Sequence, residues 1–96
     1  MRRAARVDEN QGQIVAALLR AGCSVQSLAA VGKGCPDLLV GYAGHNFLIE
    51  VKNLSKPKAD QQLTPDQEDW HNDWQGSVSV VRTPHEALAA CGMWRG

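Results

Sequence analysis

The stretch "GCPDLLVGYAGHNFLIEVK", residues 34–52, decides the fold. It reads as two apolar strands joined by a short polar turn, "AGHN", which is the pattern of a β-hairpin. The second strand ends in Glu50 and Lys52, and Asp37 stands at the head of the first. A charge held out of water costs several kcal/mol unless it is paired or bound to metal. These three residues therefore call for a functional explanation.

The strands are expected over residues 37–43 and 46–52, with the turn centred between Gly44 and His45. In an antiparallel pair this register sets two pairs opposite each other: Asp37 with Lys52, and Leu39 with Glu50. Side chains alternate between the two faces of a strand, so these four residues share one face. The opposite face is apolar and predicts the core: Leu38, Val40, Tyr42, Phe47, Ile49 and Val51.

Two carboxylates a few ångströms apart on one sheet face repel each other, and one of them must take up a proton unless a cation lies between them. Mg²⁺ or Mn²⁺ accepts carboxylate and backbone-carbonyl oxygens and keeps open positions for water and phosphate. Lys52, on the same face, can orient the attacking water or contact phosphate oxygens. The hairpin thus favours metal-assisted hydrolysis of a phosphodiester. The alternative is that Glu50 and Lys52 are a solvated Glu-x-Lys pair on a sheet face with no role in catalysis.

The remaining elements follow outward from the hairpin. Apolar residues at helical spacing predict a helix over 7–21, closed by Gly22. Thr64 as N-cap and Pro65 at the first helical position predict a second helix, which Gly76 ends. The other expected elements are a first strand over 23–31, loops over 32–36 and 53–63, a last strand over 77–83 and a closing helix over 84–90. The predicted order is α-β-β-β-α-β-α in one domain, residues 1–96.

Composition excludes several classes of protein. The 96 residues carry ten basic and ten acidic side chains, so no net charge draws the chain toward nucleic acid, although local lysine patches can still bind phosphate. Three cysteines without a close pair in the sequence argue against a disulfide framework and fit a reducing cytoplasm. No apolar run approaches the ~20 residues that span a bilayer, so no membrane association is expected.

Pro36-Asp37 followed by Glu50-Val51-Lys52 resembles the PD-(D/E)xK nuclease signature. More narrowly, "GCPDLLV", "FLIEVK" and "LTPDQEDW" resemble the virus-type replication-repair nuclease (VRR-NUC) domain in its small stand-alone form from phages and bacteria. The resemblance covers nearly the whole chain. It implies an α/β fold with a restriction-endonuclease-like α-β-β-β-α-β core, in which helices flank a mixed sheet.

The resemblance also implies roles for individual residues. Asp37 and Glu50 would be metal ligands, with the Val51 carbonyl as a third, and Lys52 would be the catalytic lysine. Gln67 matches the family's glutamine, which is expected to touch water on the metal or the substrate. The implied cofactor is Mg²⁺ or Mn²⁺.

An acidic residue on the first helix is a further family expectation, and two candidates stand side by side. At ~100° per residue, Asp8 falls within ~20° of Val15 and points with the apolar stripe toward the sheet, which favours it. Glu9 lies ~120° from Val15, but counting back from Gly22 favours Glu9 instead. The sequence leaves both open.

Several other residues carry weaker expectations. Lys33 and Gly34 lie in a loop before Asp37 that could let a DNA backbone approach, and an ordinary turn explains them equally well. Lys56 follows the active strand and could bind phosphate, although a solvated loop is the favoured role for a single lysine. Trp70 and Trp74, one helical turn apart, are expected to pack in the core. His71 is expected on an exposed helix face.

The function that these expectations favour is a Mg²⁺- or Mn²⁺-dependent DNA endonuclease, cytoplasmic in a bacterial or phage-infected cell. A chain of 96 residues presents little surface to a duplex, so a homodimer with two active sites is expected. The resemblance implies cleavage selective for branched or four-way-junction DNA. Two alternatives remain: a catalytically silent nucleic-acid-binding module on the same fold, and a protein-interaction domain, which the zero net charge favours slightly. A steep salt dependence of DNA affinity would distinguish the nucleic-acid binder from the protein-binding domain.

Overall fold

The protein is an α/β structure with a four-stranded mixed sheet and three α-helices, described here from a computed structural model. The structure describes residues 9–93. Its elements are α1 (Glu9–Arg20), β1 (Ser24–Ser27), β2 (Leu38–Tyr42), β3 (His45–Val51), α2 (Pro65–Asp73), β4 (Val78–Val81) and α3 (Pro84–Ala90), with a 3₁₀ turn, η1 (Lys58–Gln61), before α2. The predicted order of helices and strands is confirmed.

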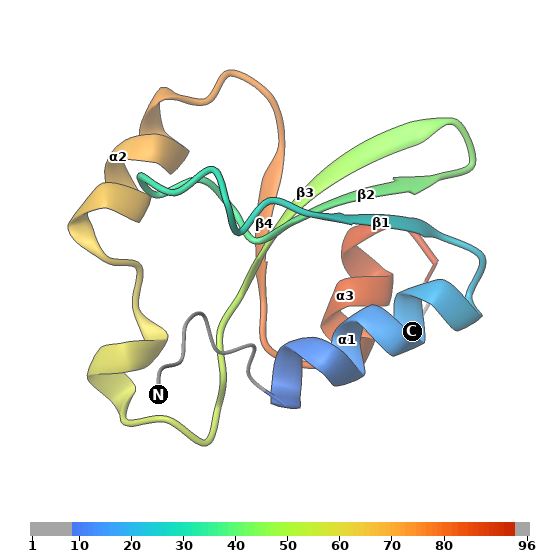
Figure 1. Ribbon diagram of the computed structural model, residues 1–96, viewed down its shortest axis with the longest axis horizontal. Coiled ribbons are helices and arrows are strands. Elements are labelled where there is room, and N and C mark those ends of the chain that lie inside the picture. The colour runs from blue at the N-terminus through green and yellow to red at the C-terminus, as the bar shows by residue number, and fades with distance from the viewer. Residues whose placement is uncertain (1–8, 94–96) are drawn as a thin grey trace.

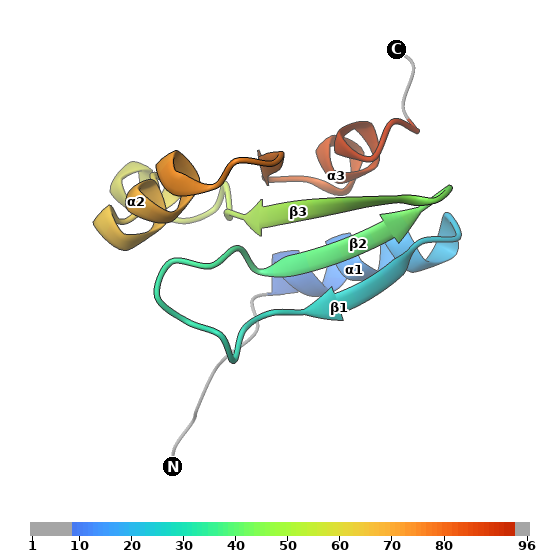
Figure 2. The same ribbon diagram turned by 90° about the horizontal axis from the view of Figure 1, so that it is seen from above.

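The sheet has the strand order β1-β2-β3-β4. The first three strands are antiparallel neighbours, whereas β3 and β4 run parallel. Parallel neighbours need a crossover connection, and here η1 and α2 provide it. Figures 1 and 2 show α1 and α3 together on one side of the sheet, while α2 lies beyond the end where β3 stops and β2 begins. The site described below lies at that end.

The core lies between the sheet and the α1–α3 pair. Its buried members come from α1, β2, β3, β4 and α3 and from two cysteines just outside these elements: Ile14, Leu18, Cys23, Leu38, Val40, Ile49, Val81, Ala87 and Cys91. Partly buried Tyr42, Phe47 and Val51 pack against them. The predicted sorting of the hairpin into an apolar face and a charged face is therefore confirmed, because both strands keep strict alternation.

The predicted hairpin register is wrong: each residue of β2 lies opposite a β3 residue two positions earlier than predicted. Leu39 lies opposite Leu48 rather than Glu50, and Tyr42 lies opposite His45. The turn consists of Ala43 and Gly44, whose φ angles of 51° and 81° are both positive. This is the conformation of a two-residue type I′ turn, which matches the twist of the flanking strands. The alternation survives because a shift of the register sum by two keeps every side chain on its face.

Other boundaries differ from the prediction for identifiable reasons. β1 ends at Ser27 instead of residue 31, since the chain leaves the sheet after the Leu28 N–H donates to the Asp37 carbonyl at 2.8 Å. α2 ends at Asp73, because Trp74 is extended, before Gly76 is reached. The loop over 53–63 contains η1, which follows Pro57 as its N-cap. Within residues 9–93, no helix is long and apolar enough to cross a membrane.

Candidate active site

Asp37 and Glu50 meet where β2 begins and β3 ends. Leu38 pairs with Ile49, so one step further along the ladder Asp37 lies directly opposite Glu50 and not opposite Lys52 as predicted. The Val51 backbone N–H donates a hydrogen bond of 2.7 Å to Asp37 Oδ2. This bond orients the Asp37 carboxylate toward β3. The structure thus brings the two predicted acidic ligands closer together than the sequence register implied.

Glu50 is an almost fully buried carboxyl group, with 2% of its side chain exposed. Burial, followed by the charge of Asp37, raises the pKa of Glu50 to about 8, while Lys52 acts in the opposite direction. Its Oε1 atom is buried and has no hydrogen-bond partner among the described residues. A buried polar atom without a partner is rare and indicates a place for water or an ion. A cation placed at this atom would favour the ionised carboxylate and displace the proton of Glu50.

Lys52 and Gln67 complete the cluster through a chain of hydrogen bonds. Gln67 Nε2 donates to Glu50 Oε2 at 2.9 Å, and Lys52 Nζ donates to Gln67 Oε1 at 2.8 Å. Lys52 Nζ also lies 3.7 Å from Glu50 Oε2, and only 10% of the Lys52 side chain is exposed. Gln67 thereby holds the acid and the amine in a fixed relation. The structure thus brings together Glu50, Lys52 and Gln67, three of the predicted site residues.

Local sequence explains why Gln67 reaches the site. Thr64 and Gln67 form a capping box: the Thr64 hydroxyl accepts from the Gln67 N–H at 3.2 Å, and Gln67 Oε1 accepts from the Thr64 N–H at 2.9 Å. Pro65 occupies the first turn, where its missing N–H costs nothing. Because one amide side chain serves both the cap and the carboxylate, the start of α2 is fixed relative to the end of β3.

Gly34 brings the preceding loop against the same helix start. A Cβ at this position would lie 2.2 Å from the Asp66 carbonyl oxygen, which only a glycine avoids. Its φ of +83° also favours glycine. The structure therefore gives Gly34 a packing role, and its predicted contact with DNA stays a prediction.

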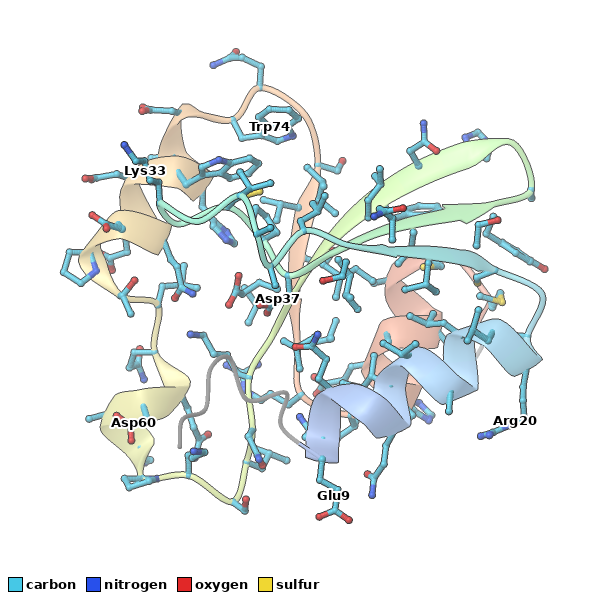
Figure 3. All side chains as sticks on the ribbon, viewed as in Figure 1. Glu9, Arg20, Lys33, Asp37, Asp60 and Trp74 are labelled. Carbon is cyan, nitrogen blue, oxygen red and sulfur yellow. The ribbon has the colours of Figure 1, made fainter. Side chains whose placement is uncertain are left out.

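Asn10 is a site residue that sequence reasoning missed. Its Nδ2 donates to the Lys52 backbone carbonyl at 2.7 Å, so α1 fixes the chain just after β3. The neighbouring candidate Glu9 is exposed, and Figure 3 shows its side chain pointing away from Asp37. Asp8 lies outside the described residues. A polar residue at the buried side of the first helical turn was the available signal for Asn10.

His71 and Cys35 also lie near the cluster. His71 follows Gln67 by one helical turn, and its Nε2 is buried without a hydrogen-bond partner among the described residues. His71 is only partly exposed, so the expected exposed position was wrong. Burial, and then the charge of Lys52, lowers the pKa of His71. Burial, and then the charges of Glu50 and Asp37, raise the pKa of the Cys35 thiol. Neither side chain was expected at the site.

The predicted phosphate-binding lysines are placed differently. Lys56 and Lys52 both line a cavity of about 210 Å³ together with Asp60. Lys33 is exposed, and Figure 3 shows it beside α2, away from Asp37. The structure therefore brings Lys56 to the site and does not bring Lys33 there.

The residues present fit a divalent cation of the oxygen-binding kind. Among residues 9–93, no three or more His, Cys, Asp or Glu side chains are placed to hold a metal ion. The available donors are two carboxylates, including the unpartnered Glu50 Oε1, and backbone carbonyls such as that of Val51. Such a set suits Mg²⁺ or Mn²⁺, which keep several waters and need few protein ligands.

Comparison with known proteins adds little to this geometry. No protein-family model matches the chain, and no solved structure matches it. A stretch of 65 residues, 66% of the chain, is 31% identical to the human adenomatous polyposis coli protein, of which it covers 2%. The chain thus spans a very small part of that protein's length, and this likeness shows no family.

Proposed function

We propose that this protein is a Mg²⁺- or Mn²⁺-dependent deoxyribonuclease. The observation that carries the proposal is the buried Glu50 carboxyl group, opposite Asp37 and joined through Gln67 to Lys52. A protein gains no stability from holding two acids and an amine in this way unless a ligand completes the arrangement. An intact set of acid, acid and lysine favours an enzyme over a silent binding module on the same fold.

The proposal includes a family. The motifs around Asp37, Glu50, Lys52 and Gln67 resemble those of the VRR-NUC domain, and the order α1-β1-β2-β3-α2-β4 is the one expected of a restriction-endonuclease-like core. Four matching residues from three separate segments meet at one point in space, which supports the resemblance more strongly than the motifs do alone. The assignment rests on this coincidence of motif and placement.

Each residue has a definite task in the proposed reaction. Asp37, Glu50 and the Val51 carbonyl would hold the cation, which supplies Lewis-acid polarisation of the phosphate and lowers the pKa of water. Lys52, whose side chain is only 10% exposed, orients water for attack on phosphorus and offsets negative charge in the transition state. Gln67 holds the Lys52 amine and the Glu50 carboxylate in a fixed relative position, and Lys56 binds a neighbouring phosphate.

DNA and a second copy of the chain are the proposed partners. A chain of 96 residues presents little surface to a duplex, and a homodimer would place two sites on one substrate. Selectivity for branched or four-way-junction DNA follows from the resemblance alone.

The test is cleavage of labelled duplex, single-stranded and four-way-junction DNA with Mg²⁺ or Mn²⁺. Wild type is compared with Lys52→Ala and with Arg20→Ala, whose side chain is exposed at the far end of α1 (Figure 3). We expect metal-dependent cleavage that Lys52→Ala loses by at least ~100-fold and Arg20→Ala retains. Absence of cleavage on all substrates by wild type at micromolar concentration would refute the proposal.

A further inference from the structure

An apolar groove lies on the sheet face that is turned away from α1 and α3. It encloses about 620 Å³ between β2, β3, α2 and the loop before β2. We call it the tryptophan groove and define it by Val31, Leu39, Leu48, Trp70 and Trp74. Leu39 and Leu48 are direct partners across the hairpin and form its floor. None of these five residues contributes to the cluster around Glu50.

The groove exposes apolar side chains together rather than singly. Val31 is 61% exposed, Trp74 46% and Leu39 36%. Trp70 and Trp74 stack on each other with ring centroids 4.6 Å apart and planes at 18°. Both line the groove and neither belongs to the core cluster, so the expectation that they pack in the core was wrong. Contiguous exposed apolar surface of this kind marks an interaction site more often than scattered apolar residues do. A rigid aromatic pair is a typical anchor for a partner.

The negative charge of α2 beside the groove restricts the kinds of molecule that can bind there. At about 100° per residue, Asp66, Asp69 and Asp73 lie on one side of the Trp70–Trp74 stripe, and Gln67 and His71 lie on the other. All three aspartates are exposed. α2 contains four acidic residues and no lysine or arginine. A negative rim therefore runs along the apolar groove on the side away from the site.

We propose that the tryptophan groove binds an amphipathic protein segment that presents apolar side chains to the tryptophans and lysine or arginine to the aspartates. Nucleic acid fits this face poorly, because its phosphates would approach three carboxylates. A second copy that binds through its own α2 fits poorly too, because α2 carries four acidic residues and no lysine or arginine to pair with them. The inference does not depend on the nuclease activity.

The test uses two model peptides with the same helical spacing of leucines, one with lysine and one with glutamate at the polar positions. Each is titrated into the ¹⁵N-labelled full chain, and amide and indole N–H signals are followed. We expect the lysine peptide alone to shift the Trp70 and Trp74 indole signals. The Kd should rise at least ~10-fold in Trp74→Ala and several-fold in Asp69→Asn combined with Asp73→Asn.

Leu54→Ser is the matched control, because Leu54 is 56% exposed but lies outside the groove; its Kd should equal that of wild type. Val31→Ser replaces Trp74→Ala if the latter fails to fold. Four results would overturn the proposal: equal binding of the glutamate peptide, shifts that map outside the groove, a single-stranded oligonucleotide that shifts the same indole signals, or self-association of the chain that Trp74→Ala abolishes.

Discussion

At the scale of single residues, the protonation of Glu50 links the site to stability. Its pKa is raised from 4.5 to about 8, mainly by burial. Between these two values the folded chain holds a proton that the unfolded chain has released, so the free energy of unfolding falls as the pH rises. We expect wild type in EDTA to lose on the order of a few kcal/mol between pH 5 and pH 8.5, measured by urea denaturation.

Glu50→Gln isolates this contribution, because an amide has no proton to lose in that range. The unfolding free energy of the variant should vary much less with pH than that of wild type. Mg²⁺ or Mn²⁺ at pH 8.5 should restore stability to wild type and not to the variant, since the cation binds the ionised carboxylate of the folded chain. If the unfolding free energies of the two proteins varied identically with pH, the pH dependence could not be assigned to Glu50.

Gln67 makes a second residue-scale prediction, because its two functions can be separated. Gln67→Glu keeps an oxygen that accepts from the Thr64 N–H but removes the Nε2 donor to Glu50. We expect cleavage to fall by about 10- to 100-fold, as for other groups that orient metal ligands. Thr64→Ala removes the cap and should cost about 1 kcal/mol of stability with little change in rate. If Gln67→Glu lowered stability and left the cleavage rate unchanged, Gln67 would serve only the start of α2.

At the scale of elements, the contact between the loop before β2 and the start of α2 depends on Gly34. Gly34→Ala introduces a Cβ that meets the Asp66 backbone, whereas Gly32→Ala introduces one with nothing within 4 Å. Both glycines have positive φ, +83° and +72°, so the backbone strain is similar. Urea denaturation should therefore show a larger loss of stability for Gly34→Ala. Equal losses would mean that the contact with α2 is unimportant.

The elements were predictable where local chemistry determines them. The alternation of the hairpin, the Thr64–Pro65 helix start and the order of elements all follow from patterns within about ten residues. The register was not predictable, because nothing in the sequence says that Ala43 adopts a positive φ. The bond from Asn10 to the Lys52 carbonyl and the burial of His71 Nε2 depend on packing between elements distant in sequence.

At the scale of the whole molecule, the absence of net charge predicts a modest dependence of DNA affinity on salt. Each phosphate contacted by a lysine contributes about −0.9 to the slope of log K against log salt concentration. Lys56→Ala should therefore weaken binding to every DNA sequence and reduce the slope by about 1. Fluorescence anisotropy at several salt concentrations measures this. An unchanged slope would place Lys56 outside the interface.

The central claim is that Asp37 and Glu50 bind a cation that DNA cleavage requires. The most direct measurement is the single-turnover rate of cleavage of a labelled four-way junction and a duplex at pH 8, first in EDTA and then with Mn²⁺. Wild type is compared with Asp37→Asn and Glu50→Gln, which keep size and remove charge. We predict no cleavage in EDTA, cleavage by wild type with Mn²⁺, and a loss of at least ~100-fold in both variants. Cleavage that persists in EDTA, or in folded variants that lack either carboxylate, would contradict the claim.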